Sequence, residues 1–216
     1  MKSGNFRYLF IGLLAVLLGM PFSANLPGSG RYSLTLLFCL FMLISIWSLV
    51  GSRRIFQFGV LLVVAIASLA GANFGLGASQ ELEIVGLGLM LVFCGLSCLI
   101  AARNVFVWHQ VDLNSLVGAF CVYLLQGLIW ALLYRMLHFF DWVNFTGNIS
   151  DQPEKVFSDL TYFSFVTLAS LGYGDISPVS GLAKTLAYLE ALVGQFYLAV
   201  MVASLVGVYS SGRRRE

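Results

Sequence analysis

Long, uninterrupted runs of apolar residues dominate the pattern of hydrophobic and polar positions along this chain. A helix needs roughly 20 predominantly apolar residues to cross a bilayer. Six runs of about that length follow one another with only short connections between most of them: 7–25, 32–51, 55–76, 82–102, 115–139 and 181–209. The pattern therefore predicts an all-α membrane protein with six transmembrane helices.

The connection between the fifth and sixth runs departs from this pattern. Residues 140–156 are mostly polar, residues 157–169 are apolar and rich in aromatic side chains, and residues 170–175 contain two glycines. The apolar part is too short to span a bilayer, so we expect it to enter the membrane as a half-length helix and to return as an irregular loop. Irregular backbone is tolerated at that depth only where protein buries it or where it lines a wet cavity. The loop 170–175 is therefore the first candidate for a functional site.

Composition places most of the chain in lipid. Hydrophobic residues make up 59% of the sequence and charged residues 10%, with a mean hydropathy of +0.90, whereas a soluble domain carries about 25% charged residues. The apolar runs contain no paired carboxylates, no group of histidines and no nucleophile beside a base. We therefore expect no enzyme active site, no cofactor, no nucleic acid and no soluble partner. The cysteines all lie inside the runs, where they are expected to pack as small apolar side chains.

Basic residues predict the orientation, because Lys and Arg in short loops favour the cytoplasmic side. Alternating crossings put eight of them on one side and four on the other. Both termini are therefore expected in the cytoplasm of a multi-pass plasma-membrane protein, with a bacterial inner membrane as the expected location. The first run is interpreted as an uncleaved signal anchor, with a cleaved signal peptide as the alternative. The eight residues on the cytoplasmic side are Lys2, Arg7, Arg53, Arg54, Arg103, Arg213, Arg214 and Arg215.

The segment Ser170-Leu-Gly-Tyr-Gly-Asp175 resembles the selectivity filter of tetrameric potassium channels. The aromatic half-helix LTYFSFVTLAS before it, and Pro178 and a long apolar helix after it, extend the resemblance to roughly residues 115–209. It implies a homotetrameric channel of voltage-gated-channel-like architecture, with a four-helix N-terminal membrane domain (1–110) and a pore domain (111–216). The implied parts of the pore domain are an outer helix (115–139), a turret (140–156), a pore helix (157–169), a filter (170–175) and an inner helix (181–209).

Backbone chemistry accounts for the residue types in the filter. A potassium ion sheds its water only where an oxygen cage replaces the hydration shell, and backbone carbonyls facing one axis can form that cage. Such a backbone alternates between left- and right-handed residues, so Gly172 and Gly174 are expected in the left-handed region that glycine adopts freely. The resemblance implies potassium coordination by the carbonyls of Ser170, Leu171, Gly172 and Tyr173. The side chains of Leu171 and Tyr173 are expected to pack against the pore helix.

Two filter residues differ from the family's usual pattern. Ser170 stands where threonine is usual, and Leu171 where valine is usual. Serine keeps the hydroxyl oxygen but lacks the methyl group that restricts the threonine rotamer. We expect potassium selectivity to persist, because GYG is intact, and filter stability and open probability to change.

The resemblance also implies residues that support the filter. Asp175 is expected to hydrogen-bond to the pore helix at the outer mouth. Tyr162 and Phe163 match the aromatic pair that surrounds the filter in this family, and both are expected to be buried. The pore helix directs its C-terminal end, which carries a partial negative charge, towards the permeation path.

The inner helix contains further candidates. Glu190 is an acid inside a membrane helix and needs a partner, for which the hydroxyl of Ser164 or Thr167 is predicted. Gly194 is either a gating hinge, as the resemblance implies, or a close-packing site of the kind common in membrane helices. Five residues on one stripe are predicted to line the cavity or gate: Gln195, Leu198, Val202, Val206 and Tyr209.

The fourth run decides against a voltage sensor. Residues 82–102 contain no Lys or Arg, whereas steep voltage sensors move several charges per subunit. The predicted function is passive, potassium-selective conduction that is not voltage-gated. A non-selective monovalent cation channel is the main alternative, and a subunit of a potassium transporter is a second one. The predicted partners are other copies of the chain and membrane lipids.

Overall fold

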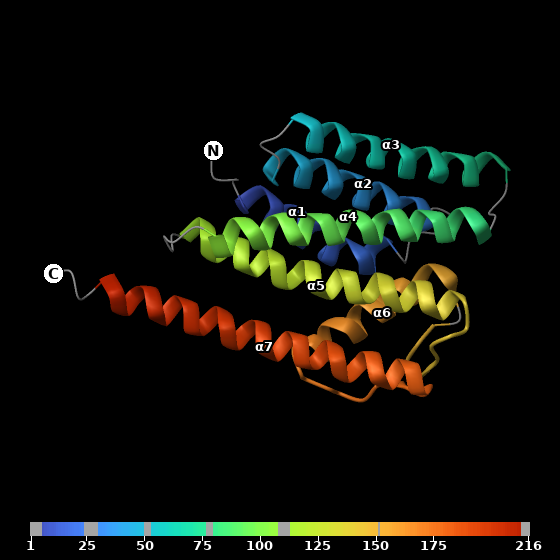
Figure 1. Ribbon diagram of the computed structural model, residues 1–216. Helices are drawn as coiled ribbons and strands as arrows, with labels where there is room; N and C mark the ends of the chain where they lie inside the picture. Colours follow the sequence, from blue (N-terminus) through green and yellow to red (C-terminus); the bar gives the residue numbers. More distant parts are fainter. Residues whose placement is uncertain are drawn as a thin grey trace.

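The computed structural model describes residues 6–23, 30–49, 53–76, 80–107, 113–150 and 152–212, and in these ranges the chain is mainly helical (Figure 1). The N-terminal half comprises α1 (Phe6–Ser23), α2 (Gly30–Leu49), α3 (Arg53–Leu76) and α4 (Gln80–Val107). The C-terminal half comprises α5 (Leu113–Phe139), β1 (Phe145–Gly147), α6 (Pro153–Leu168), β2 (Ile176–Pro178) and α7 (Gly181–Gly212).

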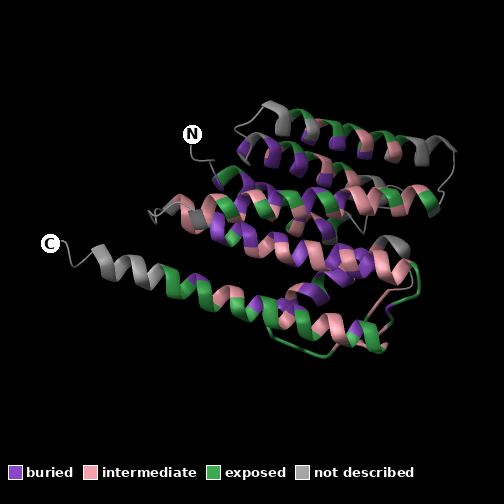
Figure 2. Cartoon of the chain, in the orientation of Figure 1, coloured by how far each residue is buried: buried purple, intermediate pink, exposed green. Residues whose placement is uncertain are grey.

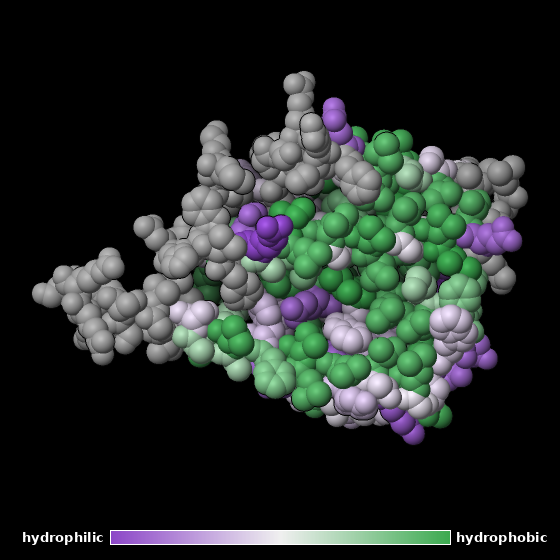
Figure 3. Space-filling model, in the orientation of Figure 1, coloured by the Kyte–Doolittle hydropathy of each residue, from purple (hydrophilic) through white to green (hydrophobic). Residues whose placement is uncertain are grey.

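Every apolar run predicted from the sequence forms a helix. Within the described residues, three helical stretches are long and apolar enough to cross a bilayer: Glu81–Val105, Asn114–Phe139 and Gly181–Ser204. Shorter apolar stretches occupy α1, α2 and α3. Apolar side chains cover most of the described surface in view (Figure 3). The chain is therefore a membrane protein.

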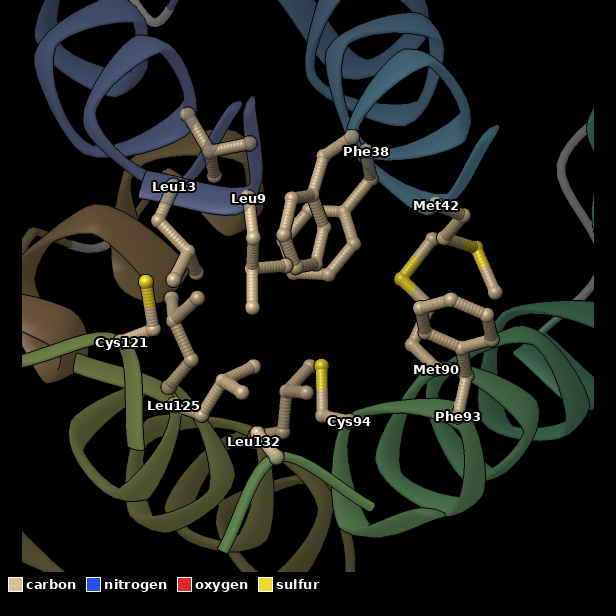
Figure 4. Packing of buried hydrophobic residues seen from close by; sticks show 14 of the residues in the cluster. Leu9, Leu13, Phe38, Met42, Met90, Phe93, Cys94, Cys121, Leu125 and Leu132 are labelled. Carbon is tan, nitrogen blue, oxygen red and sulfur yellow. The ribbon is translucent and has the colours of Figure 1, made fainter. Parts of the chain in front are cut away.

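The four N-terminal helices and α5 share one apolar core. α1 packs against α2 and α5, and α4 packs against α3 and α5. Cys94 and Cys121 are fully buried in this core, as predicted, and the thiol of Cys121 also donates to the carbonyl of Phe6 at 3.7 Å. α5 therefore packs against the N-terminal helices. Residues that fill the core, seen in Figure 4, include Leu9, Leu13, Phe38, Met42, Met90, Phe93, Leu125 and Leu132.

α7 is much less covered than α5 (Figure 2). It contacts α6, β2 and α5, and its C-terminal part diverges from the other helices (Figure 1). Only 17% of the apolar membrane-spanning stretch of α7 is buried within the chain, against 50% of the corresponding stretch of α5. A large part of α7 is therefore available to lipid or to other copies of the chain.

One predicted boundary between the outer and inner helices is wrong, namely the start of the pore helix. The half-length helix α6 begins at Pro153 rather than at residue 157. Proline favours the first turn of a helix, because its fixed φ suits the helix and its missing N–H is not needed there. The segment predicted as a polar turret contains β1, which pairs antiparallel with β2 and places Thr146 opposite Ser177. This pairing adds a small sheet to the predicted all-α fold.

Candidate functional site

The C-terminal end of α6 leads directly into residues 170–175, called here the filter segment. The backbone N–H of Ser170 donates to the carbonyl of Thr167 at 2.9 Å, and that of Leu171 donates to the carbonyl of Val166 at 2.9 Å. These bonds satisfy carbonyls that a helix end otherwise leaves free. They also fix the direction in which the filter segment leaves the helix.

The backbone of the filter segment alternates in hand. Ser170, Gly172 and Gly174 have φ values of +55°, +57° and +79°, and the residues between them do not lie at positive φ. The prediction for the two glycines is confirmed, and the left-handed Ser170 was not foreseen. A Cβ at either glycine would meet no atom of the described residues within 4 Å, so the backbone angle, and not lack of space, calls for glycine. Alternation of hand turns successive carbonyls towards one side of the segment.

The short sheet holds the outer end of the filter segment. The backbone N–H of Asn148, just after β1, donates to the carbonyl of Asp175 at 2.8 Å. A Cβ at Gly147 would overlap that same carbonyl oxygen, and Gly147 has a φ of +104°. Ser177 Oγ donates to the carbonyl of Gly174 at 3.2 Å. The segment between α5 and α6 therefore anchors the filter segment, a role that the sequence did not reveal.

A side-chain bond adds to this anchor. The hydroxyl of Tyr162 on α6 donates to Asp175 Oδ2 at 2.7 Å, which is the contact expected between Asp175 and the pore helix. The hydrogen bond to Asp175 raises the pKa of Tyr162, so the phenol stays protonated and remains the donor. The C-terminal end of the filter segment is thus held by both backbone and side-chain bonds.

At the inner end, one predicted cavity residue touches the filter segment. Gln195 Nε2 on α7 donates to Ser170 Oγ at 2.9 Å. Leu198 is half-buried and Val202 is 54% exposed, both on the poorly covered helix α7. The side chains of the other two predicted lining residues, Val206 and Tyr209, lie outside the described residues.

A buried polar contact joins three helices behind the filter segment. Glu190 on α7 is fully buried, and Ser164 Oγ on α6 lies 2.5 Å from its Oε1. Ser164 is one of the two partners predicted from the sequence. The sequence missed the second hydroxyl, Tyr134 on α5, which donates to Oε2 at 2.7 Å. The available signal was a tyrosine inside a mostly apolar run.

Two glycines let the helices approach one another at this point. A Cβ on Gly194 would overlap the carbonyl oxygen of Leu168 at the end of α6. A Cβ on Gly127 of α5 would lie 2.6 Å from ring carbons of Phe165. Close packing therefore accounts for glycine at 194, and the hinge role stays a prediction.

Only one member of the aromatic pair on α6 is buried as expected. Phe163 is buried and packs edge-on against Tyr134 and Phe145, with ring centroids 5.4 and 5.0 Å apart. Tyr162 is 41% exposed, so the prediction of its burial is wrong within one chain. Leu171 and Tyr173 are 57% and 68% exposed, so α6 of the same chain does not bury them as predicted. More than half of each of these two side chains is therefore exposed within one chain.

Comparison with known proteins finds similarity to ion channels. The family described as "Ion channel" matches residues 118–211. Protein LctB of Bacillus caldotenax is 35% identical over 101 residues, which cover 45% of this chain and 75% of that protein. Protein LctB of Geobacillus stearothermophilus is 35% identical over 109 residues, or 49% of this chain and 79% of that protein. The inward rectifier potassium channel Kirbac3.1 of Paramagnetospirillum magnetotacticum is 50% identical over 50 residues, or 23% of this chain and 17% of that protein. No solved structure matches the chain significantly.

Proposed function

Because this chain belongs to the potassium channel family and is an ion channel rather than an enzyme, we propose that it conducts K⁺ selectively and passively across a membrane. The observation that carries the proposal is the alternating hand of residues 170–174. It turns successive carbonyl oxygens to one side, where they can replace the water shell of a cation. Potassium is the proposed ion because GYG is intact and because one similar protein is an inward rectifier potassium channel.

The proposed coordination uses the backbone carbonyls of Ser170, Leu171, Gly172 and Tyr173. The C-terminal end of α6 adds a partial negative charge at the inner end of the filter segment, which favours a cation there. Asp175 adds a carboxylate at the outer mouth. The ion is the transported substrate, and no other cofactor enters the proposal.

A homotetramer follows from the geometry of a carbonyl ring. One chain supplies one filter segment, so a closed ring requires several copies, and four is the number in this family. The exposure of Leu171 and Tyr173 supports this assembly, because neighbouring copies would cover them. The poorly buried apolar surface of α7 supports it as well. Burial of that surface between copies and against lipid removes apolar area from water.

We further propose six crossings of a plasma membrane with both termini in the cytoplasm, most simply a bacterial inner membrane. Arg135 of α5 and Glu83 of α4 form an ion pair of 2.6 Å, so the C-terminal end of α5 lies beside the N-terminal end of α4. This antiparallel arrangement of α4 and α5 supports the alternating membrane crossings from which we predict the orientation. Because residues 82–102 of α4 carry no Lys or Arg, the proposed gating is not driven by a charged voltage-sensing helix.

Flux through purified protein tests the proposal. Vesicles loaded with K⁺ should lose it through the reconstituted protein, Ba²⁺ should block the loss, and Rb⁺ but not Na⁺ should replace K⁺. Equal Na⁺ and K⁺ reversal potentials would favour a non-selective cation channel instead. Flux that requires a coupled ion gradient would favour a transporter subunit, and vesicles without any flux would refute conduction.

A further inference from the structure

A buried polar cluster lies behind the filter segment, where α5, α6 and α7 meet. Tyr134, Ser164 and Glu190 each have 0% of their surface exposed. Tyr134 Oη lies 2.7 Å from Glu190 Oε2, and Ser164 Oγ lies 2.5 Å from Glu190 Oε1. The same Oγ lies 2.8 Å from the carbonyl oxygen of Gly127. The cluster thus contains three short oxygen–oxygen contacts.

These contacts need more protons than the hydroxyl groups supply. Each contact is a hydrogen bond only if one of its two oxygens carries a proton pointing at the other. Tyr134 and Ser164 contribute one proton each, and the carbonyl of Gly127 contributes none. If Glu190 is ionised, Ser164 can donate to Glu190 or to Gly127 but not to both, and the remaining contact sets lone pairs against each other. One further proton, on Oε1 of Glu190, turns all three contacts into hydrogen bonds.

The surroundings of Glu190 also favour its protonated form. No described Lys or Arg forms an ion pair with it, and an unpaired charge away from water is strongly unfavourable. Ser164 belongs to the C-terminal half of α6, where the helix dipole is negative and further disfavours a carboxylate. The neutral acid avoids both penalties and keeps every polar atom of the cluster bonded.

We propose that Glu190 is a neutral carboxylic acid in the assembled channel and acts as a positioning residue for the filter segment. Its Oε1–H donates to Ser164 Oγ, Ser164 donates to the Gly127 carbonyl, and Tyr134 donates to Oε2. This chain of bonds ties α6 to both α5 and α7 six residues before Ser170. The protonated state of Glu190 is inferred from the cluster alone. The effect of this state on K⁺ selectivity rests on the proposed function.

Two substitutions of similar size test whether the channel needs Glu190 as a neutral hydrogen-bonding group or as a charged carboxylate. In Glu190→Gln, the amide NH₂ can donate to Ser164 and the amide oxygen can accept from Tyr134, so K⁺ flux and K⁺ over Na⁺ selectivity should stay within about twofold of the wild type. In Glu190→Leu, both bonds to Glu190 are lost and the buried Tyr134 hydroxyl is left without an acceptor, so flux or selectivity should fall by about tenfold or more. Size-exclusion chromatography establishes whether each variant assembles. A Gln variant that assembles but is as impaired as the Leu variant would overturn the proposal.

Infrared spectroscopy tests the proton without any need for conduction. The difference spectrum between the wild type and Glu190→Gln should contain the carbonyl stretch of a protonated carboxyl group, and this band should shift in D₂O. Carboxylate bands in its place would overturn the proposal. If the Gln variant does not assemble, Ser164→Ala is the reference. Loss of the hydroxyl that accepts from Glu190 should shift the carbonyl band of a protonated Glu190. If Glu190 is ionised, the difference spectrum should contain no such band. A wild type that shows the band but passes no K⁺ would refute the proposed function while the proton assignment stands.

Discussion

The N-terminal helices with α5 and the pore region formed by α6, the filter segment and α7 are held together by different kinds of contact. Apolar side chains such as Phe38, Phe93 and Leu125 interlock in the first region. The second has a smaller apolar cluster around Phe163, and hydrogen bonds at Glu190, Asp175 and Gln195 link its elements. Dispersed apolar contacts give stability that many residues share, whereas directional bonds give a geometry that few residues control. The two regions should therefore fail differently when they are mutated.

The regions also differ in how complete they are within one chain. The apolar window of α5 is half buried by its own chain, and that of α7 is largely uncovered. Side chains of the filter segment are exposed as well. The first region forms a core within one chain, and the exposed surfaces of the pore region are those that the proposed oligomer would cover.

The largest effect should come from Gly172→Ala. Gly172 has a φ of +57°, where a residue with a Cβ is less stable by about 1–2 kcal/mol. Ala can relieve this strain by rotating the peptide, which turns a carbonyl away from the permeation path. We expect K⁺ flux in vesicles to be abolished while the oligomer still assembles, as measured by size-exclusion chromatography.

Gly71→Ala in α3 is the matched control in the other region. A Cβ at Gly71 would meet nothing within 4 Å and the residue is helical, so alanine should be neutral or slightly stabilising. Flux should then match the wild type. Normal conduction by Gly172→Ala would contradict the proposed role of the filter segment.

Gly194→Ala should have the next largest effect. The new methyl group would overlap the carbonyl oxygen of Leu168, so α7 must move away from the end of α6 and from the bond between Gln195 and Ser170. We expect less oligomer and strongly reduced flux per oligomer. Gly95→Ala in α4, where a Cβ meets no atom within 4 Å, should leave both measurements unchanged. Equal behaviour of the two variants would show that the close approach at Gly194 is unimportant.

The contrast between the regions also explains what could be predicted from the sequence. The helices were predictable because bilayer thickness fixes the length of an apolar run, and Gly172 and Gly174 because few residues adopt their backbone angles. Tyr134 and the strand around Thr146 were missed, because their partners lie far away in the sequence and no local pattern marks them. The exposure of Tyr162 was also missed, because the sequence alone does not show which aromatic residues of α6 face the rest of the chain.

Leu125→Ala should lower stability without changing selectivity. Leu125 is fully buried between the N-terminal helices and α5. Removing a buried leucine side chain costs about 2–5 kcal/mol, including the cavity left behind. We expect a lower melting temperature in detergent and an unchanged ratio of K⁺ to Na⁺ permeability in the channels that assemble. A changed permeability ratio would mean that the core of the first region also shapes the filter segment.

Tyr162→Phe should have a smaller effect, confined to the outer mouth. It removes the bond to Asp175 but leaves the backbone bond from Asn148 to the Asp175 carbonyl. Single-channel recordings should show open times shortened severalfold with conductance retained. A double-mutant cycle with Asp175→Asn checks the cause, because two residues that act through one bond give non-additive effects. Additive effects would show that Tyr162 and Asp175 act separately.

The smallest effect should be that of membrane voltage. Moving one elementary charge through 100 mV is worth roughly 2.3 kcal/mol, yet residues 82–102 of α4 carry no basic charge and Phe93 and Cys94 fix this helix in the core. We expect open probability to vary with less than about one effective charge per channel, and Arg103→Gln near the C-terminal end of α4 to leave that slope unchanged. A steep sigmoidal activation curve would mean that the first region moves through the field, and the contrast between a static core and a responsive pore would no longer hold.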